Sequence, residues 1–148
     1  MTPTVLVACR KNAGRSQAAA ALMRYYAGDA VVVLSGGSEP ADAIHPEVRL
    51  VLSELGLVPE EHPQAFDAAM VKAADVVVTM GCGESCPYFP GRRYLDWPVD
   101  DPHDQPLPEV RRIVADIDGR VLALLAEVVP ELELPGAPLS GLLESTEH

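Results

Sequence analysis

Residues 4–28 read TVLVACRKNAGRSQAAAALMRYYAG and fall into three parts. The first, residues 4–8, is a short apolar run with β-branched side chains, which is typical of a buried strand. The second, residues 9–16, is polar. The third, residues 17–26, consists of strong helix formers and is followed by Gly28, a residue type common just past helix ends. This order predicts a strand, a loop that begins at Cys9, and a helix.

The same alternation continues along the chain. Further strands are predicted at residues 31–34, 75–80 and 93–99, and helices at residues 65–74, at residues 109–129 and from Pro46 to just before Gly56. Strands that alternate with helices predict an α/β fold, a three-layer sandwich with helices on both faces of a parallel sheet. Ligands of such folds bind beyond the carboxyl ends of the strands, so the loops at residues 9, 82 and 100 are expected to meet at one rim.

Composition limits the class of protein. A chain of 148 residues with 48% hydrophobic residues suits one domain, which we expect at residues 1–129, before an acidic tail with proline and glycine at residues 130–148. A net charge of −11 argues against a nucleic-acid or membrane partner. Three cysteines, no secretion signal and no apolar run near the ~20 residues of a membrane span predict a cytoplasmic protein, which we expect to be a monomer.

The loop after the first strand is suited to bind an anion. Backbone N–H groups and the helix dipole at such a loop attract a tetrahedral oxyanion, and Arg15 can close over it with a bidentate guanidinium. The same potential favours the thiolate form of Cys9. Gly14 and Asn12 are expected to supply any positive φ. A plainer alternative is that Cys9 is a small buried residue at a strand end. The residues expected to bind the anion are Arg10, Lys11, Asn12, Ala13, Gly14, Arg15 and Ser16.

A family resemblance rests on these and later residues. The motif Cys-x5-Arg-Ser at residues 9–16, with Ser35-Gly36-Gly37, Ile44-His45-Pro46 and Asp101-Pro102 further along, resembles the low-molecular-weight protein tyrosine phosphatase superfamily and, within it, the arsenate reductase branch. The likeness extends over about residues 4–128. The resemblance implies a four-stranded parallel sheet flanked by helices, Cys9 as the nucleophile and Asp101 as the general acid.

Three carboxylates, those of Asp96, Asp100 and Asp101, lie close together in the sequence around the end of the predicted fourth strand. Like charges held close together favour protonation of one of them, and expulsion of an oxide from a tetrahedral centre needs a proton donor. The sequence alone does not separate Asp100 from Asp101, whereas the resemblance selects Asp101. The next residues are Pro102 and His103 rather than the aromatic residues of phosphatase acid loops, which disfavours an aryl phosphate substrate.

Two more cysteines, Cys82 and Cys86, follow the predicted third strand. The resemblance implies a relay in which Cys82 attacks the sulfur of arsenylated Cys9, and Cys86 then takes over the disulfide. Two other interpretations are half a zinc site, for which no histidines have ligand spacing, and thiols without a redox role. Ala20 stands where some relatives carry a glutamate associated with potassium, so no bound metal is expected.

Three functions from different classes remain open. The leading hypothesis is an arsenate reductase that uses the Cys9, Cys82 and Cys86 relay, holds no bound cofactor and takes electrons from thioredoxin or a low-molecular-weight thiol. The alternative is a low-molecular-weight phosphatase that hydrolyses phosphate monoesters through a phosphocysteine at Cys9. The third is a non-enzymatic sensor of oxyanions or redox state.

Overall fold

The computed structural model describes residues 2–59, 62–81 and 91–135. Within them, one parallel sheet has the strand order β2-β1-β3-β4, which confirms the predicted four-stranded parallel sheet. The strands are β1 (Thr4–Cys9), β2 (Val32–Gly37), β3 (Val76–Met80) and β4 (Arg93–Asp96). The helices are α1 (Arg15–Ala27), α2 (Pro46–Glu54), α3 (Ala68–Ala73) and α4 (Leu107–Val128), and a 3₁₀ turn, Gly28–Ala30, follows α1.

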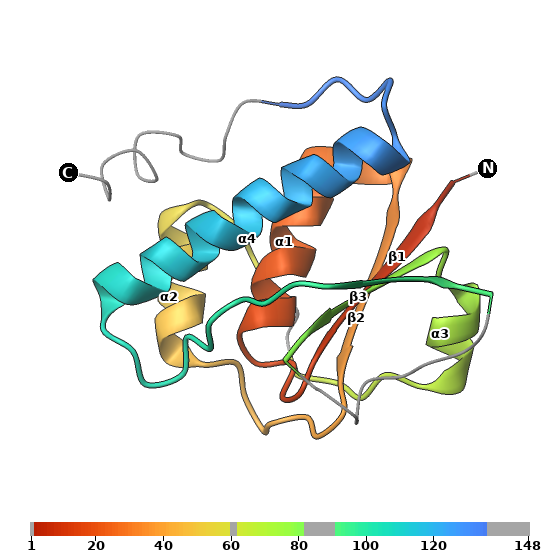
Figure 1. The fold of residues 1–148 in the computed structure, drawn as a ribbon. Coiled ribbons are helices and arrows are strands. Elements are labelled where there is room, and N and C mark those ends of the chain that lie inside the picture. Colours follow the sequence, from red (N-terminus) through yellow and green to blue (C-terminus); the bar gives the residue numbers. More distant parts are fainter. Residues whose placement is uncertain (1, 60–61, 82–90, 136–148) are drawn as a thin grey trace.

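Helices cover both faces of the sheet, as the predicted three-layer sandwich requires. Figure 1 shows α1, α2 and α4 together on one side of the sheet and α3 on the other. The side chains of β1 alternate between the two layers: Val5 and Val7 belong to the larger core with α1 and α4, whereas Leu6 belongs to the smaller core with α3. Burial on both faces explains why the central strands are continuous apolar runs.

Two glycines account for the largest difference between the predicted and the observed strands. The strand predicted to end at Leu34 continues to Gly37. A Cβ at Gly36 would lie 2.6 Å from the backbone nitrogen of Phe66, and a Cβ at Gly37 would lie 2.6 Å from the carbonyl oxygen of Arg10. The glycines therefore let two other segments pack closely against β2, and they do not end the strand.

The other predicted elements are present with shifted ends. The fourth strand ends at Asp96 instead of residue 99, α3 occupies only residues 68–73 of the predicted 65–74, and α1 begins at Arg15, two residues before the predicted helix. Pro46 begins α2, and Gly56 follows it with a φ of 73°, as the sequence predicts.

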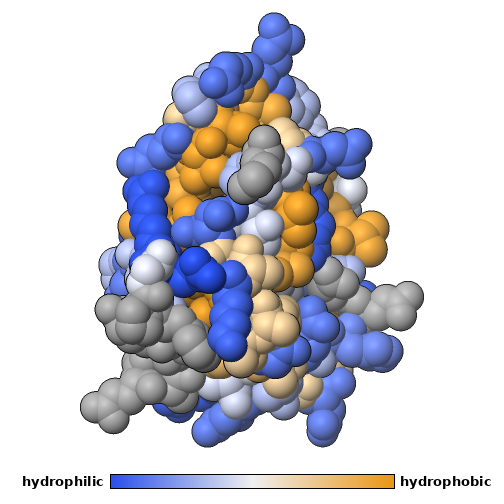
Figure 2. Space-filling view, turned by 90° about the vertical axis from the view of Figure 1, so that its right-hand side faces the viewer, coloured by the Kyte–Doolittle hydropathy of each residue, from blue (hydrophilic) through white to orange (hydrophobic). Residues whose placement is uncertain are grey.

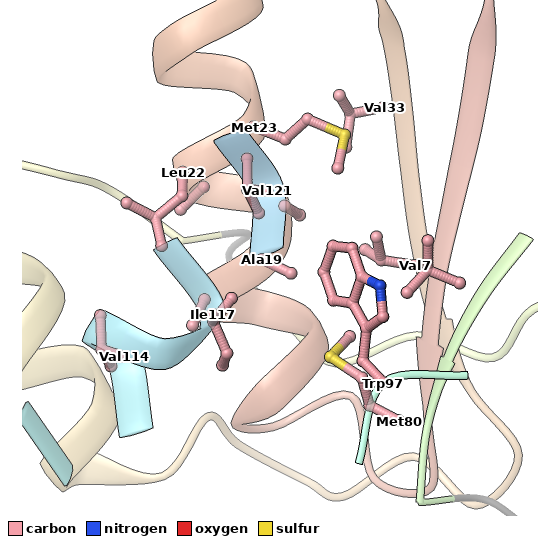
Figure 3. Close-up of a cluster of buried hydrophobic side chains, with 14 of the residues drawn as sticks. Val7, Ala19, Leu22, Met23, Val33, Met80, Trp97, Val114, Ile117 and Val121 are labelled. Carbon is pink, nitrogen blue, oxygen red and sulfur yellow. The ribbon is translucent and has the colours of Figure 1, made fainter. Parts of the chain in front are cut away.

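The long helix α4 covers the larger core with one apolar stripe. Val128 at the end of the stripe is only partly buried, whereas the stripe is otherwise buried, at Val110, Ile113, Val114, Ile117, Val121, Leu124 and Leu125. Figure 3 shows the indole of Trp97 in this cluster, with Val7 and Met80 of the sheet and Ile117 of α4 around it. Trp97 follows β4 directly, and its backbone N–H donates to the carbonyl oxygen of Thr79 at 2.8 Å. Its burial fixes the point from which the chain continues to Asp101.

The face drawn in Figure 2 carries both kinds of side chain: an apolar area extends over its upper half, with hydrophilic side chains around it. Among the described residues, no helix combines the length and the apolar run that a bilayer crossing needs.

Candidate active site

The loop between β1 and α1, residues 9–15, turns its backbone N–H groups inward; we call it the anion loop. The carbonyl oxygens of residues 9 to 14 all accept hydrogen bonds from flanking segments. The donors are Ser38 N at 3.3 Å, Glu39 N at 2.8 Å, Ala41 N at 3.0 Å, Gln17 Nε2 at 3.0 Å, His45 N at 2.8 Å and Ala18 N at 2.9 Å. In a trans peptide the N–H points away from the preceding C=O, so the N–H groups of residues 10 to 15 face the opposite side. The N-terminus of α1 adds positive potential there.

The thiol of Cys9 lies at the end of a chain of hydrogen bonds. Cys9 is 2% exposed, and its Sγ is 2.9 Å from Ser16 Oγ. Asn12 Nδ2 donates to the same Oγ at 2.7 Å. The orientation of the Asn12 amide is fixed because its Oδ1 accepts from the backbone N–H of Gln64 at 2.9 Å. The Ser16 hydroxyl accepts from Asn12, which leaves its own proton available for a hydrogen bond to the Cys9 sulfur.

Asn12, and not Gly14, provides the positive φ of the anion loop. Asn12 has a φ of 49°, whereas Gly14 has a φ of −140°. Gly14 is needed for close packing instead, because a Cβ there would lie 3.0 Å from His45 Cδ2 and 3.1 Å from Pro102 Cγ. The expectation that Gly14 supplies left-handed geometry is therefore wrong, and the reason for the glycine is the contact with two other segments.

Arg15 is the first residue of α1 and points its guanidinium into the site. Its side chain is 13% exposed, and its Nε is buried without a hydrogen-bond partner among the described residues. Nη1 donates to the carbonyl oxygen of Val99 at 3.4 Å, and Nη2 lies 3.7 Å from Asp101 Oδ2. A buried guanidinium with an unused donor is suited to bind an anion in the loop.

Gly81 has no side chain and therefore leaves the space that the Arg15 guanidinium occupies. It has a φ of 82°, and a Cβ there would lie 2.3 Å from Arg15 Nη1. We expect Gly81→Ala to displace the guanidinium and to weaken inhibition by inorganic phosphate about tenfold. Gly91→Ala is the matched control: its φ is 90°, so it adds similar backbone strain, but it has open space around a Cβ. Equal phosphate affinities in the two variants would contradict the packing role of Gly81.

The structure distinguishes between the three carboxylates, which the sequence alone could not do. Asp96 Oδ1 accepts from Thr79 Oγ1 at 3.0 Å, and Asp100 pairs with Arg112 of α4 at 2.8 Å. Asp101 lies at the site, beside Arg15. Each of the three has a different partner, and Asp101 alone lines the same recess as Cys9.

A cavity of about 560 Å³ leads to this recess. Its lining includes Arg10, Lys11, Arg15, His45, Asp101 and His103. The recess that Cys9 lines shares four of these residues, Lys11, Arg15, His45 and Asp101. Three basic residues around the cavity give it a local positive charge on a chain whose net charge is −11.

Sequence reasoning missed two groups at the site. His103 lines the cavity, and its ring lies 4.5 Å from that of His45. Its position directly after Asp-Pro was the signal that could have identified it. Burial, followed by the proximity of His103, lowers the pKa of His45 below its ordinary value. Gln64 orients Asn12 from 52 residues away, and no local pattern could have indicated this contact.

Cys82 and Cys86 lie outside the described residues. The described chain leads toward them from the site: Met80 is the Cα partner of Cys9 in the sheet, and Gly81 packs against Arg15. The cysteines of the alternative interpretation, half a zinc site, therefore also fall outside the described residues. Within residues 2–59, 62–81 and 91–135, no group of three or more histidine, cysteine or carboxylate residues could hold a metal ion.

Known proteins are similar in sequence to this chain over most of its length. The family described as low molecular weight phosphotyrosine protein phosphatase matches residues 4–134. A protein of Halobacterium salinarum is 36% identical over 129 residues, which are 83% of this chain and 91% of the relative. An arsenate reductase of Brevibacillus brevis is 30% identical over 123 residues, which are 80% of this chain and 90% of the relative.

Solved structures share the fold. The thioredoxin-dependent arsenate reductase of Corynebacterium glutamicum is 43% identical, with a TM-score of 0.76 over 86% of this chain; the match spans 62% of that chain's length. An arsenate reductase of Archaeoglobus fulgidus is 30% identical, with a TM-score of 0.73 over 82% of this chain and 98% of its own. An arginine phosphatase of Geobacillus stearothermophilus, at 20% identity and a TM-score of 0.73 over 87% of this chain and 94% of its own, is similar in fold alone.

Proposed function

This chain belongs to the low molecular weight phosphotyrosine protein phosphatase family, and on that premise we propose that it reduces arsenate to arsenite. The observation that carries the proposal is the course of the chain after β3. Met80 pairs with Cys9, Gly81 packs against Arg15, and the next residue in the sequence is Cys82. A phosphatase has no use for a second thiol at this place, whereas a reductase needs two thiols to supply two electrons.

The first step takes place at Cys9. Its thiolate attacks the arsenic of arsenate held by the N–H groups of the anion loop and by Arg15, and water leaves with a proton from Asp101. The product is a Cys9 thioester of arsenic acid, in which arsenic is still As(V). The Ser16 hydroxyl lies 2.9 Å from the sulfur and can donate a hydrogen bond to it before the attack, and the guanidinium of Arg15 lies 3.7 Å from the Asp101 carboxylate.

The second step transfers the electrons. The thiolate of Cys82 attacks the Cys9 sulfur, the electron pair of the S–As bond goes to arsenic, and arsenite leaves as As(III). A Cys9–Cys82 disulfide remains. Cys86 then attacks Cys82, which frees Cys9 and leaves a Cys82–Cys86 disulfide for reduction by an external thiol donor. Thiol chemistry of this kind fits a reducing compartment, so we propose that the protein acts in the cytoplasm, against arsenic.

Asp101 is the proposed proton donor of the first step. We expect Asp101→Asn to slow the single-turnover reaction of Cys9 with arsenate about 10²-fold, because an amide cannot donate the proton that the leaving oxygen needs. Inhibition by inorganic phosphate should change little, since the anion loop and Arg15 remain. Asp100→Asn is the matched control, because Asp100 pairs with Arg112 and does not line the recess. An unchanged rate in Asp101→Asn would remove Asp101 from the mechanism.

The proposed function is tested by release of arsenite from arsenate with thioredoxin and thioredoxin reductase, compared with low-molecular-weight thiols. We expect turnover with one of these donors and a disulfide in the enzyme when the donor is omitted. If no donor supports arsenite release while phosphate esters are hydrolysed, the reductase assignment is wrong.

The family membership favours one second candidate, hydrolysis of phosphate monoesters. A loop that binds arsenate also binds phosphate, and Cys9 with Asp101 would form and break a phosphocysteine without the other thiols. We therefore expect weak phosphatase activity in either case.

A further inference from the structure

We propose that the imidazoles of His45 and His103 form a contacting pair that positions Asp101 over the anion loop. The inference rests on the proposed role of Asp101 and adds two positioning residues to it. The two imidazoles come from different parts of the chain: His45 precedes α2, and His103 belongs to the acid segment, by which we mean residues 99–106. Their ring centroids are 4.5 Å apart, with an interplanar angle of 36°.

Each histidine forms a backbone hydrogen bond with one of the two segments that must lie close together, the anion loop and the acid segment. The backbone N–H of His45 donates to the carbonyl oxygen of Ala13 in the anion loop at 2.8 Å. The backbone N–H of His103 donates to Asp101 Oδ1 at 3.0 Å. The contact between the two rings therefore connects the anion loop to the carboxylate of the acid segment.

A second contact supports the same arrangement at Gly14. A Cβ on Gly14 would lie 3.0 Å from His45 Cδ2 and 3.1 Å from Pro102 Cγ. The imidazole of His45 and the ring of Pro102 thus both pack against the anion loop at one glycine. This places the residue that follows Asp101 in contact with the loop that binds the substrate.

Asp101 needs such support because little else holds it. Its side chain is 57% exposed; it accepts a hydrogen bond from the His103 N–H and forms a long ion pair with Arg15 Nη2, which is 3.7 Å away. A separation of 3.7 Å at a partly exposed position is a weak restraint. A general acid must stay within hydrogen-bond reach of the leaving oxygen, so a loss of position lowers the rate without changing the anion site.

The charges around the pair make its stability dependent on pH. Arg10, Lys11 and Arg15 line the same cavity, whereas Asp101, Asp104 and Glu47 are the acidic groups near the rings; Asp104 Oδ2 lies 3.2 Å from His103 Nε2. Burial and His103 lower the pKa of His45, so His45 is neutral at neutral pH. Protonation of His45 in acid is opposed by His103, whose ring centroid is 4.5 Å away, and therefore acts against the contact.

The test compares His103→Ala, which removes the ring, with His103→Phe, which keeps a flat ring that cannot be protonated. Single-turnover rates are measured with arsenate and, separately, with phenyl phosphate, whose cleavage needs the same acid. We expect His103→Ala to lower both rates about tenfold and to leave inhibition by inorganic phosphate within about twofold. His103→Phe should keep the single-turnover rate of the parent protein at neutral pH. As the pH is lowered, its rate should fall less than that of the parent protein. His62→Ala, an exposed histidine not among the residues that line the cavity, is the control and should change neither.

A double variant that combines His103→Ala with Asp101→Asn shows which of the proposed roles has failed. If His103 acts through Asp101, the double variant Asp101→Asn/His103→Ala is no slower than Asp101→Asn alone. Additive losses, a parallel loss of phosphate inhibition, or equal rates for His103→Ala and the parent protein would each overturn the positioning role. An unchanged rate in Asp101→Asn would instead remove the acid itself. Failure of arsenate turnover alone, with the phenyl phosphate results as expected, would overturn the reductase assignment and leave the pair in place.

Discussion

Replacement of Cys9 by serine is expected to abolish arsenate reduction and phosphate ester hydrolysis together, with a fall of at least about 10⁴-fold in each. The serine hydroxyl is not ionised near neutral pH, and its side-chain partner among the described residues, the Ser16 hydroxyl at 2.9 Å, is not a base that could remove its proton. Serine also cannot form the disulfide that the second step requires. The two activities are measured side by side, with thermal unfolding as a check on the fold.

Phosphate binding distinguishes loss of the Cys9 nucleophile from disruption of the anion loop. Cys9→Ser should still bind inorganic phosphate, because the N–H groups and Arg15 remain. Ser38→Ala is a suitable control: its hydroxyl is buried without a hydrogen-bond partner among the described residues, and its backbone N–H bonds to the Cys9 carbonyl at 3.3 Å. It should keep both activities. Hydrolysis by Cys9→Ser at more than a trace level would show that another group attacks the substrate.

The second large effect is expected for Cys82→Ser, which should stop arsenite release and leave phosphate ester hydrolysis at the parent level. Without a thiol at this position the arsenic stays bound to Cys9 as As(V), and no electrons reach it. The measurement is arsenite released per enzyme molecule, with and without thioredoxin. Arsenite release at the parent rate with thioredoxin would show that the donor attacks the Cys9 adduct directly.

Cys86→Ser distinguishes the two positions of the relay. In this variant Cys82 can still release the first arsenite, but the Cys9–Cys82 disulfide has no internal successor. We therefore expect one arsenite per enzyme molecule and then a halt, against none for Cys82→Ser. Equal yields in the two variants would mean that the order of the relay is different.

The parts of the fold that local patterns determine were predictable. The apolar run of β1, the strong helix formers of α1 and the apolar stripe of α4 each indicate the element that they form. The glycines of β2 could not be interpreted in this way, because their meaning lies in the backbone of Phe66 and Arg10, which pack where a side chain would be. A local pattern contains no information about that approach.

The same distinction between local patterns and long-range contacts applies to the candidate site. Cys9 and Arg15 could be selected from their spacing around one loop. The choice between Asp100 and Asp101 depends on Arg112, which holds Asp100 from α4 and is a long-range contact that sequence order does not reveal. The orientation of Asn12 depends on Gln64 for the same reason. The candidate residues for the chemistry could be chosen by type, whereas the residues that contact and orient them could not.

The position of β1 in the sheet also has a mechanical consequence. Cys9 ends a strand that is paired on both sides, with Gly37 on one and Met80 on the other, so its backbone is held from both sides. In the proposed reaction we therefore expect arsenate and the second thiol to approach a Cys9 that stays in place. We expect the rate of electron delivery to depend on the approaching thiol and not on the nucleophile.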